Sequence, residues 1–136
     1  MSIERINPPE LAKPSGFAHA VRTTGRTVVH LAGQTAMDAD GRIIEGGVVV
    51  QFEQALGNLL TALRAAGGAP DDLVSLTIYI VDVADYQAHA REIGAVWRRL
   101  VGTVYPATAG IGVSRLWDRE ALVEVQGVAA LTAPAG

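Results

Sequence analysis

The strongest pattern in the 136-residue chain is an apolar stripe between Val49 and Ala66. Apolar side chains recur there at the spacing of one helical face, and Gly67-Gly68 provides a typical end signal. The residues of the stripe are Phe52, Ala55, Leu56, Leu59 and Leu63. Such a helix is stable only when its apolar face is buried, so the rest of the chain must supply a surface for it to cover.

Segments that alternate with period two supply that surface. Leu73–Val81 alternates cleanly and predicts a strand, as do the runs near Ala107–Ser114 and Ala121–Leu131. The stretch HAVRTTGRTVVHLAGQ predicts a hairpin whose tight turn is Thr24-Gly25. Asp82 and Asp85 favour the start of a second helix, because carboxylates stabilise helix N-termini. Its apolar stripe is Tyr86, Ala90, Ile93, Trp97 and Val101.

The expected order is therefore ββ-α-β-α-ββ within a single domain, residues 1–136. Two helices are too few to cover both faces of the sheet, so we predict an α+β fold with two helices on one face of a mixed sheet. The other face must then meet water or a partner. The last strand carries apolar residues on both faces, which predicts a homo-oligomer.

Composition excludes several classes of function. The chain contains no cysteine, which removes disulfides and thiolate chemistry, and its net charge of -3 disfavours a nucleic-acid-binding surface. His19, His30 and His89 lack metal-ligand spacing, so no metal is expected. No apolar run has the length of a membrane span, and the first ten residues do not resemble a signal peptide. We therefore expect a cytoplasmic protein.

Glu124 is the anomaly among the predicted strands. It lies in the middle of ALVEVQGVAAL, with apolar residues on both sides. A carboxylate in such a place must be paired or hydrogen-bonded, or must hold its proton more tightly than an exposed carboxyl does. Two interpretations stay open. Glu124 is either structural, facing solvent on an edge strand or pairing with an arginine, or it is a functional carboxylate in a site.

Six stretches, in sequence order, resemble the Rid family of YjgF-like proteins. They run from about Asn7 to Leu131, and Gln51 and Asn58 match the family's Gln-x6-Asn-Leu helix. Residues 106–109, PATA, stand where the family has Pro-Ala-Arg-Ser, and residues 123–126, VEVQ, where it has Ile/Val-Glu-Ile/Val-Glu. The other resembling stretches are SGFAHAV, VVHLAGQ and LTIYIVDVADY.

The resemblance implies a chorismate-mutase-like (YjgF-like) fold and a homotrimer with three clefts between subunits. The best-known members of the family hydrolyse reactive enamines and imines. In these proteins the arginine of Pro-Ala-Arg-Ser clamps the substrate carboxylate, and the first glutamate of the last strand positions the attacking water. No cofactor is implied.

Carried over residue by residue, the pattern is largely lost. Thr108 stands at the position of the clamp arginine, and Gly110 at that of the family's Cys or Ser. Phe17 replaces a tyrosine, and Ala90 replaces a helix asparagine. A threonine hydroxyl cannot reproduce the bidentate pair of an arginine with a carboxylate, a loss on the order of 2–5 kcal/mol. The expected ligand is therefore a neutral or hydrophobic small molecule.

Glu124 is retained and becomes the expected catalytic residue, as a base on water or on an acidic proton of the ligand. The residues expected to bind substrate are Phe17, His19, Gly33, Gln34, Ala90, Thr108, Ala109 and Gly110. Three functions follow in order of preference. The first is a divergent hydrolase (deaminase-like) of enamines or imines, the second a non-catalytic trimer that binds a small molecule, and the third an endoribonuclease.

Overall fold

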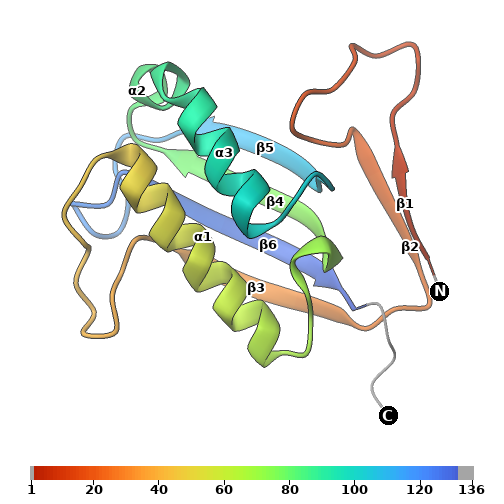
Figure 1. Ribbon diagram of the computed structural model, residues 1–136, viewed down its shortest axis with the longest axis horizontal. Coiled ribbons are helices and arrows are strands. Elements are labelled where there is room, and N and C mark those ends of the chain that lie inside the picture. The colour runs from red at the N-terminus through yellow and green to blue at the C-terminus, as the bar shows by residue number, and fades with distance from the viewer. Residues whose placement is uncertain (1, 132–136) are drawn as a thin grey trace.

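The computed structural model describes residues 2–131 (Figure 1). Its strands are β1 (Ser2–Ile6), β2 (Ala20–Thr24), β3 (Val28–Gln34), β4 (Leu73–Ile80), β5 (Ala107–Gly112) and β6 (Val123–Ala130). Its helices are α1 (Val48–Ala65), α2 (Val83–Ala88) and α3 (Ala90–Leu100), and a 3-10 turn covers Pro70–Asp72.

A four-stranded mixed sheet forms the body of the fold, in the order β3-β6-β4-β5. β6 runs antiparallel to both β3 and β4, whereas β5 runs parallel to β4. Helices α1 and α3 lie across one face of this sheet (Figure 1). The predicted α+β fold with helices on one face of a mixed sheet is therefore confirmed.

The alternation of the central strands decides which face is the core. Leu76 and Ile78 of β4, together with Val123 and Val125 of β6, point toward the helices and are buried. They pack there against the buried stripe of α1, which includes Phe52, Leu56, Leu59, Leu60 and Leu63. The residues that alternate with these in β4 and β6 point to the opposite face, which no described helix covers (Figure 1). They are Ser75, Thr77, Tyr79, Glu124, Gln126 and Val128.

The predicted hairpin around Thr24-Gly25 is wrong. The chain does turn there, with Gly25 at φ 63°, but the two flanking strands belong to different sheets. β2 pairs with β1, which the sequence patterns did not predict, while β3 pairs with β6. The side chain of Arg26 is buried, and its Nη1 donates to the carbonyl oxygen of Ala130 at 3.3 Å.

Both helix-end predictions are confirmed. The side chain of Asp82 accepts a 3.0 Å hydrogen bond from the backbone N–H of Asp85 and caps α2. At the end of α1 the N–H of Gly68 donates to the carbonyl of Leu63 at 3.0 Å, with Gly67 at φ 91°. The predicted second helix is interrupted, however, because α2 and α3 meet at His89. Within residues 2–131, no helix combines the length and apolar character of a membrane span.

Candidate functional site

Glu124 lies on an inner strand and is half-buried, so the interpretation of an exposed edge-strand carboxylate is excluded. It stands opposite Tyr79 of β4, on the sheet face away from the helices. Its side chain extends over Gly33 of β3, where a Cβ would lie 2.9 Å from the Glu124 Cδ. Among residues 2–131 no arginine, lysine or histidine forms an ion pair with it. Glu124 is therefore available to interact with a ligand or with water.

Two amides of α1 hold the segments on which Gly33 and Glu124 lie. Gln51 is buried, accepts a 2.8 Å hydrogen bond from the N–H of Leu122 and donates to the carbonyl of Glu120. Two helical turns later, Asn58 donates to the carbonyls of Thr35 and Met37, at 3.1 and 2.8 Å. The first amide fixes the start of β6 and the second the end of β3. The matched motif residues therefore have a positioning role, because they connect α1 to both strands.

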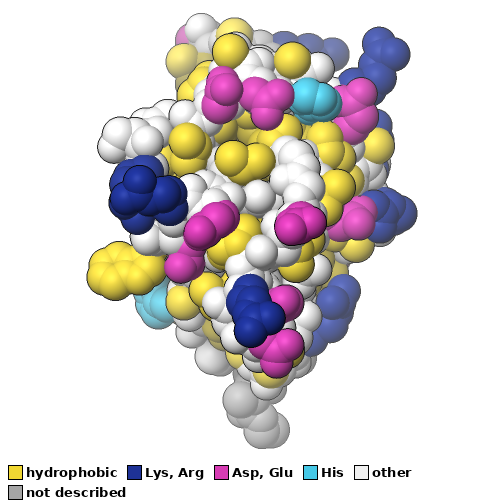
Figure 2. All heavy atoms as spheres, turned by 90° about the vertical axis from the view of Figure 1, so that its left-hand side faces the viewer, with side chains coloured by type: hydrophobic (Ala, Val, Ile, Leu, Met, Phe, Trp, Pro, Cys, Tyr) yellow, Lys and Arg dark blue, Asp and Glu magenta, His cyan; other side chains and the backbone are white. Residues whose placement is uncertain are grey.

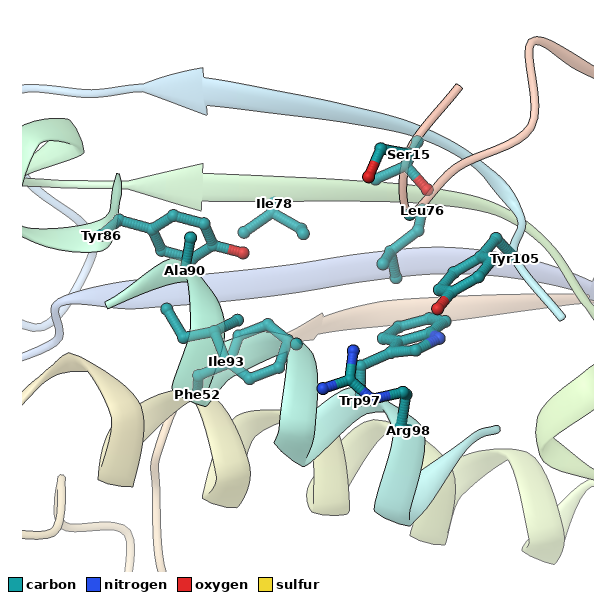
Figure 3. Close-up of a pocket in the computed structure, with 13 residues that line it drawn as sticks. Ser15, Phe52, Leu76, Ile78, Tyr86, Ala90, Ile93, Trp97, Arg98 and Tyr105 are labelled. Carbon is teal, nitrogen blue, oxygen red and sulfur yellow. The ribbon is translucent and has the colours of Figure 1, made fainter. Parts of the chain in front are cut away.

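A cavity of about 360 Å³ lies on the helix side of the sheet, between β4, β5, α2 and α3 (Figure 3). Two of the expected site residues, Ala90 and Thr108, line it together. Most of its wall is apolar or aromatic and comes from Phe52, Leu76, Ile78, Ile93, Trp97 and Tyr105. The size and the apolar lining are typical of a pocket that binds a small molecule.

The polar groups of this cavity are hydrogen-bond donors. Burial raises the pKa of Tyr86 to about 12, so its hydroxyl keeps its proton at neutral pH. The indole nitrogen of Trp97 is buried and has no hydrogen-bond partner among the described residues. The Trp97 ring itself stacks on Tyr105, with ring centroids 6.1 Å apart. Arg98 contributes a guanidinium group, and Thr108 a hydroxyl that already donates to the carbonyl of Pro106 at 2.9 Å.

A second hollow lies where the chain around Ala18 meets the start of β5. The N–H of Ala18 donates to the carbonyl of Pro106 at 3.0 Å, which holds the preceding loop beside β5. Phe17, His19 and Ala109 line this hollow, and Thr108 borders both hollows. Phe17 and His19 pack edge to face, with ring centroids 5.1 Å apart.

The expected site residues thus form two groups, separated by the sheet. Thr108 and Gly110 stand opposite Leu76 and Ile78 and face the helices, whereas Ala109 faces the same side as Glu124. Glu124 lies with Gly33, and Gln34 follows the irregularity in the pairing of β3 with β6. One protomer therefore does not bring Thr108 and Glu124 to a common surface.

The sequence patterns did not single out Arg98 and Tyr86 as site residues. Tyr86 and Ala90 belong to the predicted apolar stripe, while Gly94 and Arg98 continue the same four-residue spacing. A Cβ on Gly94 would lie 3.4 Å from Arg98 Nη1, so the guanidinium extends over the glycine. A charged residue and a glycine on the edge of an apolar stripe were the signal that could have identified this wall.

At one end of the molecule, the charge distribution gives no support to a nucleic-acid-binding surface. Figure 2 shows the end of the molecule that carries the loops before α1 and β6, where acidic side chains are interspersed with hydrophobic ones and the basic groups are scattered. Residues 2–131 also contain no group of three histidine or acidic side chains that could hold a metal ion.

Comparison with known proteins gives a consistent result. The family model described as Endoribonuclease L-PSP matches residues 9–131. A RutC family protein of Pyrococcus horikoshii is 29% identical over 86% of this chain and 89% of its own length. The 2-iminobutanoate/2-iminopropanoate deaminase of Capra hircus is 31% identical over 74% of this chain and 71% of its own length.

Among solved structures, the Rid-family protein YyfB of Yersinia pestis, itself of unknown function, superposes with a TM-score of 0.83. It is 36% identical, and the match covers 96% of this chain and 100% of that protein. The match of the family model spans both the Glu124 strand and the loop that carries Phe17. The chain therefore belongs to the Rid family, whose family model bears the description Endoribonuclease L-PSP.

Proposed function

We propose that the protein is a divergent imine or enamine hydrolase in which Glu124 positions and activates water. The observation that carries the proposal is the Glu124 carboxylate itself, half-buried, placed over Gly33 and without an ion-pair partner among the described residues. The relatives named 2-iminobutanoate/2-iminopropanoate deaminase support the reaction class. No resident cofactor is needed, because water is the only co-reactant of this hydrolysis.

The reaction balances with one glutamate and one water. An enamine first tautomerises to the imine by protonation at carbon. The oxygen of water then attacks the imine carbon while Glu124 accepts a proton from the water and passes it to the imine nitrogen, so that a carbinolamine forms. When the C–N bond breaks, the hydroxyl proton passes through Glu124 to the nitrogen, which leaves as ammonia or an amine, and a carbonyl compound remains.

We further propose a homotrimer in which the Glu124 of one subunit faces the Thr108 cavity of the next. Two features of the protomer support an assembly. β5 is an edge strand, and several of its residues are exposed, including Ile111 at 43%. The face of the sheet that carries Glu124 also has no helix over it in the protomer (Figure 1). A neighbouring subunit against this edge would bring the two groups of site residues together.

The substrate we propose is a hydrophobic small molecule. Thr108 provides no cation where Rid-type deaminases clamp a carboxylate, and the hydroxyl is already committed to the Pro106 carbonyl. The aromatic and aliphatic wall of the adjoining cavity favours an apolar body on the ligand. Thr108 by itself is compatible with neutral substrates, and it disfavours short 2-imino acids such as 2-iminopropanoate.

The test is hydrolysis of a hydrophobic imine generated in situ by a flavin-dependent amine oxidase from phenylethylamine. We expect the wild-type protein to accelerate formation of the aldehyde and ammonia, and the Glu124→Gln variant to lose at least about a hundredfold in rate. Glu45→Gln changes an exposed carboxyl on the loop before α1 and is the matched control. Equal rates for wild type and Glu124→Gln would show that Glu124 is structural.

A non-catalytic binding trimer is the second candidate. It is favoured by the loss of the clamp at Thr108 together with a well-formed cavity that retains ordered donors. The net charge of -3 disfavours the endoribonuclease activity that the description of the family model suggests. For either candidate we propose a small-molecule partner and a cytoplasmic location.

A further inference from the structure

Arg98 is the one charged side chain among the described residues that line the cavity beside Thr108. No hydrogen bond or ion pair joins its guanidinium to any residue in 2–131, whereas its neighbour Arg99 pairs with Glu53 on α1. Figure 3 shows the Arg98 side chain turning from α3 toward the cavity beside the Trp97 ring. An unpaired guanidinium at the edge of an apolar cavity is a binding group for an anion.

We propose that Arg98 is the anion-recognising residue of this cavity, and that its ligand is a hydrophobic monoanion with one carboxylate. The inference rests on the proposed function insofar as this ligand is taken to be the substrate. The carboxylate lies against Arg98 and the apolar body extends between the sheet and α3. Thr108 alone predicts a neutral ligand, because it provides no cation. Arg98 supplies a cation from α3, so of two hydrophobic ligands of the same shape the anion should bind more tightly than the neutral one.

The shape of α3 makes this arrangement possible. Gly94 lies one helical turn before Arg98, and a Cβ there would be 3.4 Å from Nη1. The absence of a side chain at Gly94 therefore lets the guanidinium lie back along the helix toward the cavity. Its planar group offers a pair of parallel N–H donors that match the two oxygens of a carboxylate.

The surrounding polar groups agree with an anion and not with a cation. Tyr86 keeps its proton at neutral pH, and Trp97 Nε1 is a buried donor without a partner. The other polar side chains of the wall are the hydroxyls of Ser15 and Tyr105 and that of Thr108, which already donates to the carbonyl of Pro106. No Asp or Glu is among the described lining residues of the protomer, so the one acidic group expected near a bound carboxylate is the Glu124 that a neighbouring subunit brings in the proposed trimer.

The dimensions of the cavity set the size of the apolar body. A volume of about 360 Å³ with walls from Ile78, Ile93 and Trp97 accommodates a phenylalkyl group or a medium alkyl chain. The methyl group of 2-iminopropanoate would leave most of this apolar surface in contact with water. The cavity therefore favours a ligand that combines a long apolar group with one carboxylate.

The experiment uses phenylbutanoate and its neutral isostere phenylbutanamide as probes, with calorimetric titration of the full-length protein. We expect the wild-type protein to bind the carboxylate at least tenfold more tightly than the amide. Arg98→Gln should weaken carboxylate binding at least tenfold and leave amide binding unchanged. Arg91→Gln removes the same charge from the same helix outside the cavity, so it is the matched control and should bind both probes as wild type does.

Three results would overturn the inference: equal affinity of the wild type for both probes, no binding of the carboxylate at millimolar concentration, or equal losses in Arg98→Gln and Arg91→Gln. Glu124→Gln separates this inference from the proposed function, because it should keep the preference for the carboxylate while losing hydrolysis. If no imine is hydrolysed and the Arg98-dependent preference persists, the inference about the ligand stands without the enzymatic one.

Discussion

The absence of a side chain at Gly33 on β3 leaves the space in which the carboxyl group of Glu124 on β6 lies. A Cβ on Gly33 would stand 2.9 Å from Glu124 Cδ and would collide with Oε2. The backbone conformation does not require a glycine here, because the φ angle of Gly33 is not positive. The close approach of the side chain is therefore the reason for a glycine at this position.

Gly33→Ala should move the Glu124 carboxylate without unfolding the protein. Glu124 can rotate away, and alanine in a strand regains about 0.5–1 kcal/mol relative to glycine, so the free energy of unfolding should stay within about 1 kcal/mol of wild type. Imine hydrolysis should fall at least about tenfold, because small displacements of a catalytic group are costly. Gly57→Ala on α1, where a Cβ meets nothing within 4 Å, is the control and should retain full activity.

The exposed edge of the sheet leads to a prediction about assembly. Ile111 of β5 is 43% exposed on the face that carries Glu124, and a lysine there would put a charge into any subunit contact along this edge. The wild-type protein should sediment as a trimer in analytical ultracentrifugation, and Ile111→Lys should shift it toward monomer with an unchanged circular dichroism spectrum. A monomeric wild type would remove the inter-subunit site.

Local patterns were sufficient to predict the elements that face the core. Burial of one face gives α1 a helical period of apolar residues and gives β4 a period of two. Both periods can be read from the sequence. Pairing was harder to predict. β2 and β3 are neighbours in sequence, and a turn lies between them, yet each pairs with a strand remote from that turn. The strand β1 is only five residues long, and thirteen residues separate it from its partner β2.

Only the part of the site that a local pattern reveals was predicted from the sequence. Glu124 stood out because a carboxylate among apolar neighbours is unusual within one strand. Arg98 did not, because a charged residue on a helix is ordinary until tertiary structure shows what lies beneath it. The cavity is created by the packing of α3 over β4 and β5, a long-range relationship that no spacing within α3 reports.

Gln51→Leu should destabilise the protein and impair the site together. The change leaves the partly buried N–H of Leu122 and the carbonyl of Glu120 without their partner. One unsatisfied buried group costs about 1–3 kcal/mol, so urea denaturation should show a loss in that range. Gln87→Leu alters an exposed glutamine on α2 and should leave the midpoint nearly unchanged. Equal midpoints for the two variants would contradict the bridging role of Gln51.

His89, where α2 meets α3, should give a pH-dependent contribution to stability. A hydrogen bond to the backbone carbonyl of Asp85 raises the pKa of His89 above 6.5, with further help from the charges of Asp85 and Glu92. A raised pKa stabilises the fold below pH 6.5, and this contribution is lost as the pH rises through the folded-state value. His89→Gln should therefore lower Tm in acidic buffer and match wild type in alkaline buffer.

A nuclear magnetic resonance titration of His89 provides the direct measurement. Its pKa should exceed 6.5 in the wild type and fall in Asp85→Asn, which keeps the backbone carbonyl but removes the charge. The fall should be partial, because the hydrogen bond to the backbone is the larger cause. A His89 pKa at or below 6.5 would contradict the assignment.

Asp72 and Arg26 form a buried charge pair that connects the 3-10 turn to the start of β3, with Arg26 Nη1 4.0 Å from Asp72 Oδ1. Their side chains are 7% and 2% exposed for Arg26 and Asp72, respectively. Asp72→Ala would leave Arg26 buried without its counter-charge, and it would also remove the acceptor of the Ala69 N–H. Breaking a buried pair in this way costs about 3–5 kcal/mol, which should appear as a large drop in the urea midpoint.

Asp71→Ala is the matched control for this prediction, because Asp71 is the exposed neighbour in the same turn. Asp71→Ala should change the free energy of unfolding by no more than about 0.5 kcal/mol, as other surface substitutions do. The double variant Arg26→Met with Asp72→Leu should recover much of the loss, since an apolar pair of similar volume removes both desolvation penalties at once. A cost for Asp72→Ala no greater than that for Asp71→Ala would mean that water reaches the pair. In that case the apolar packing of the buried Leu73, and not the charge pair, would hold the 3-10 turn in position.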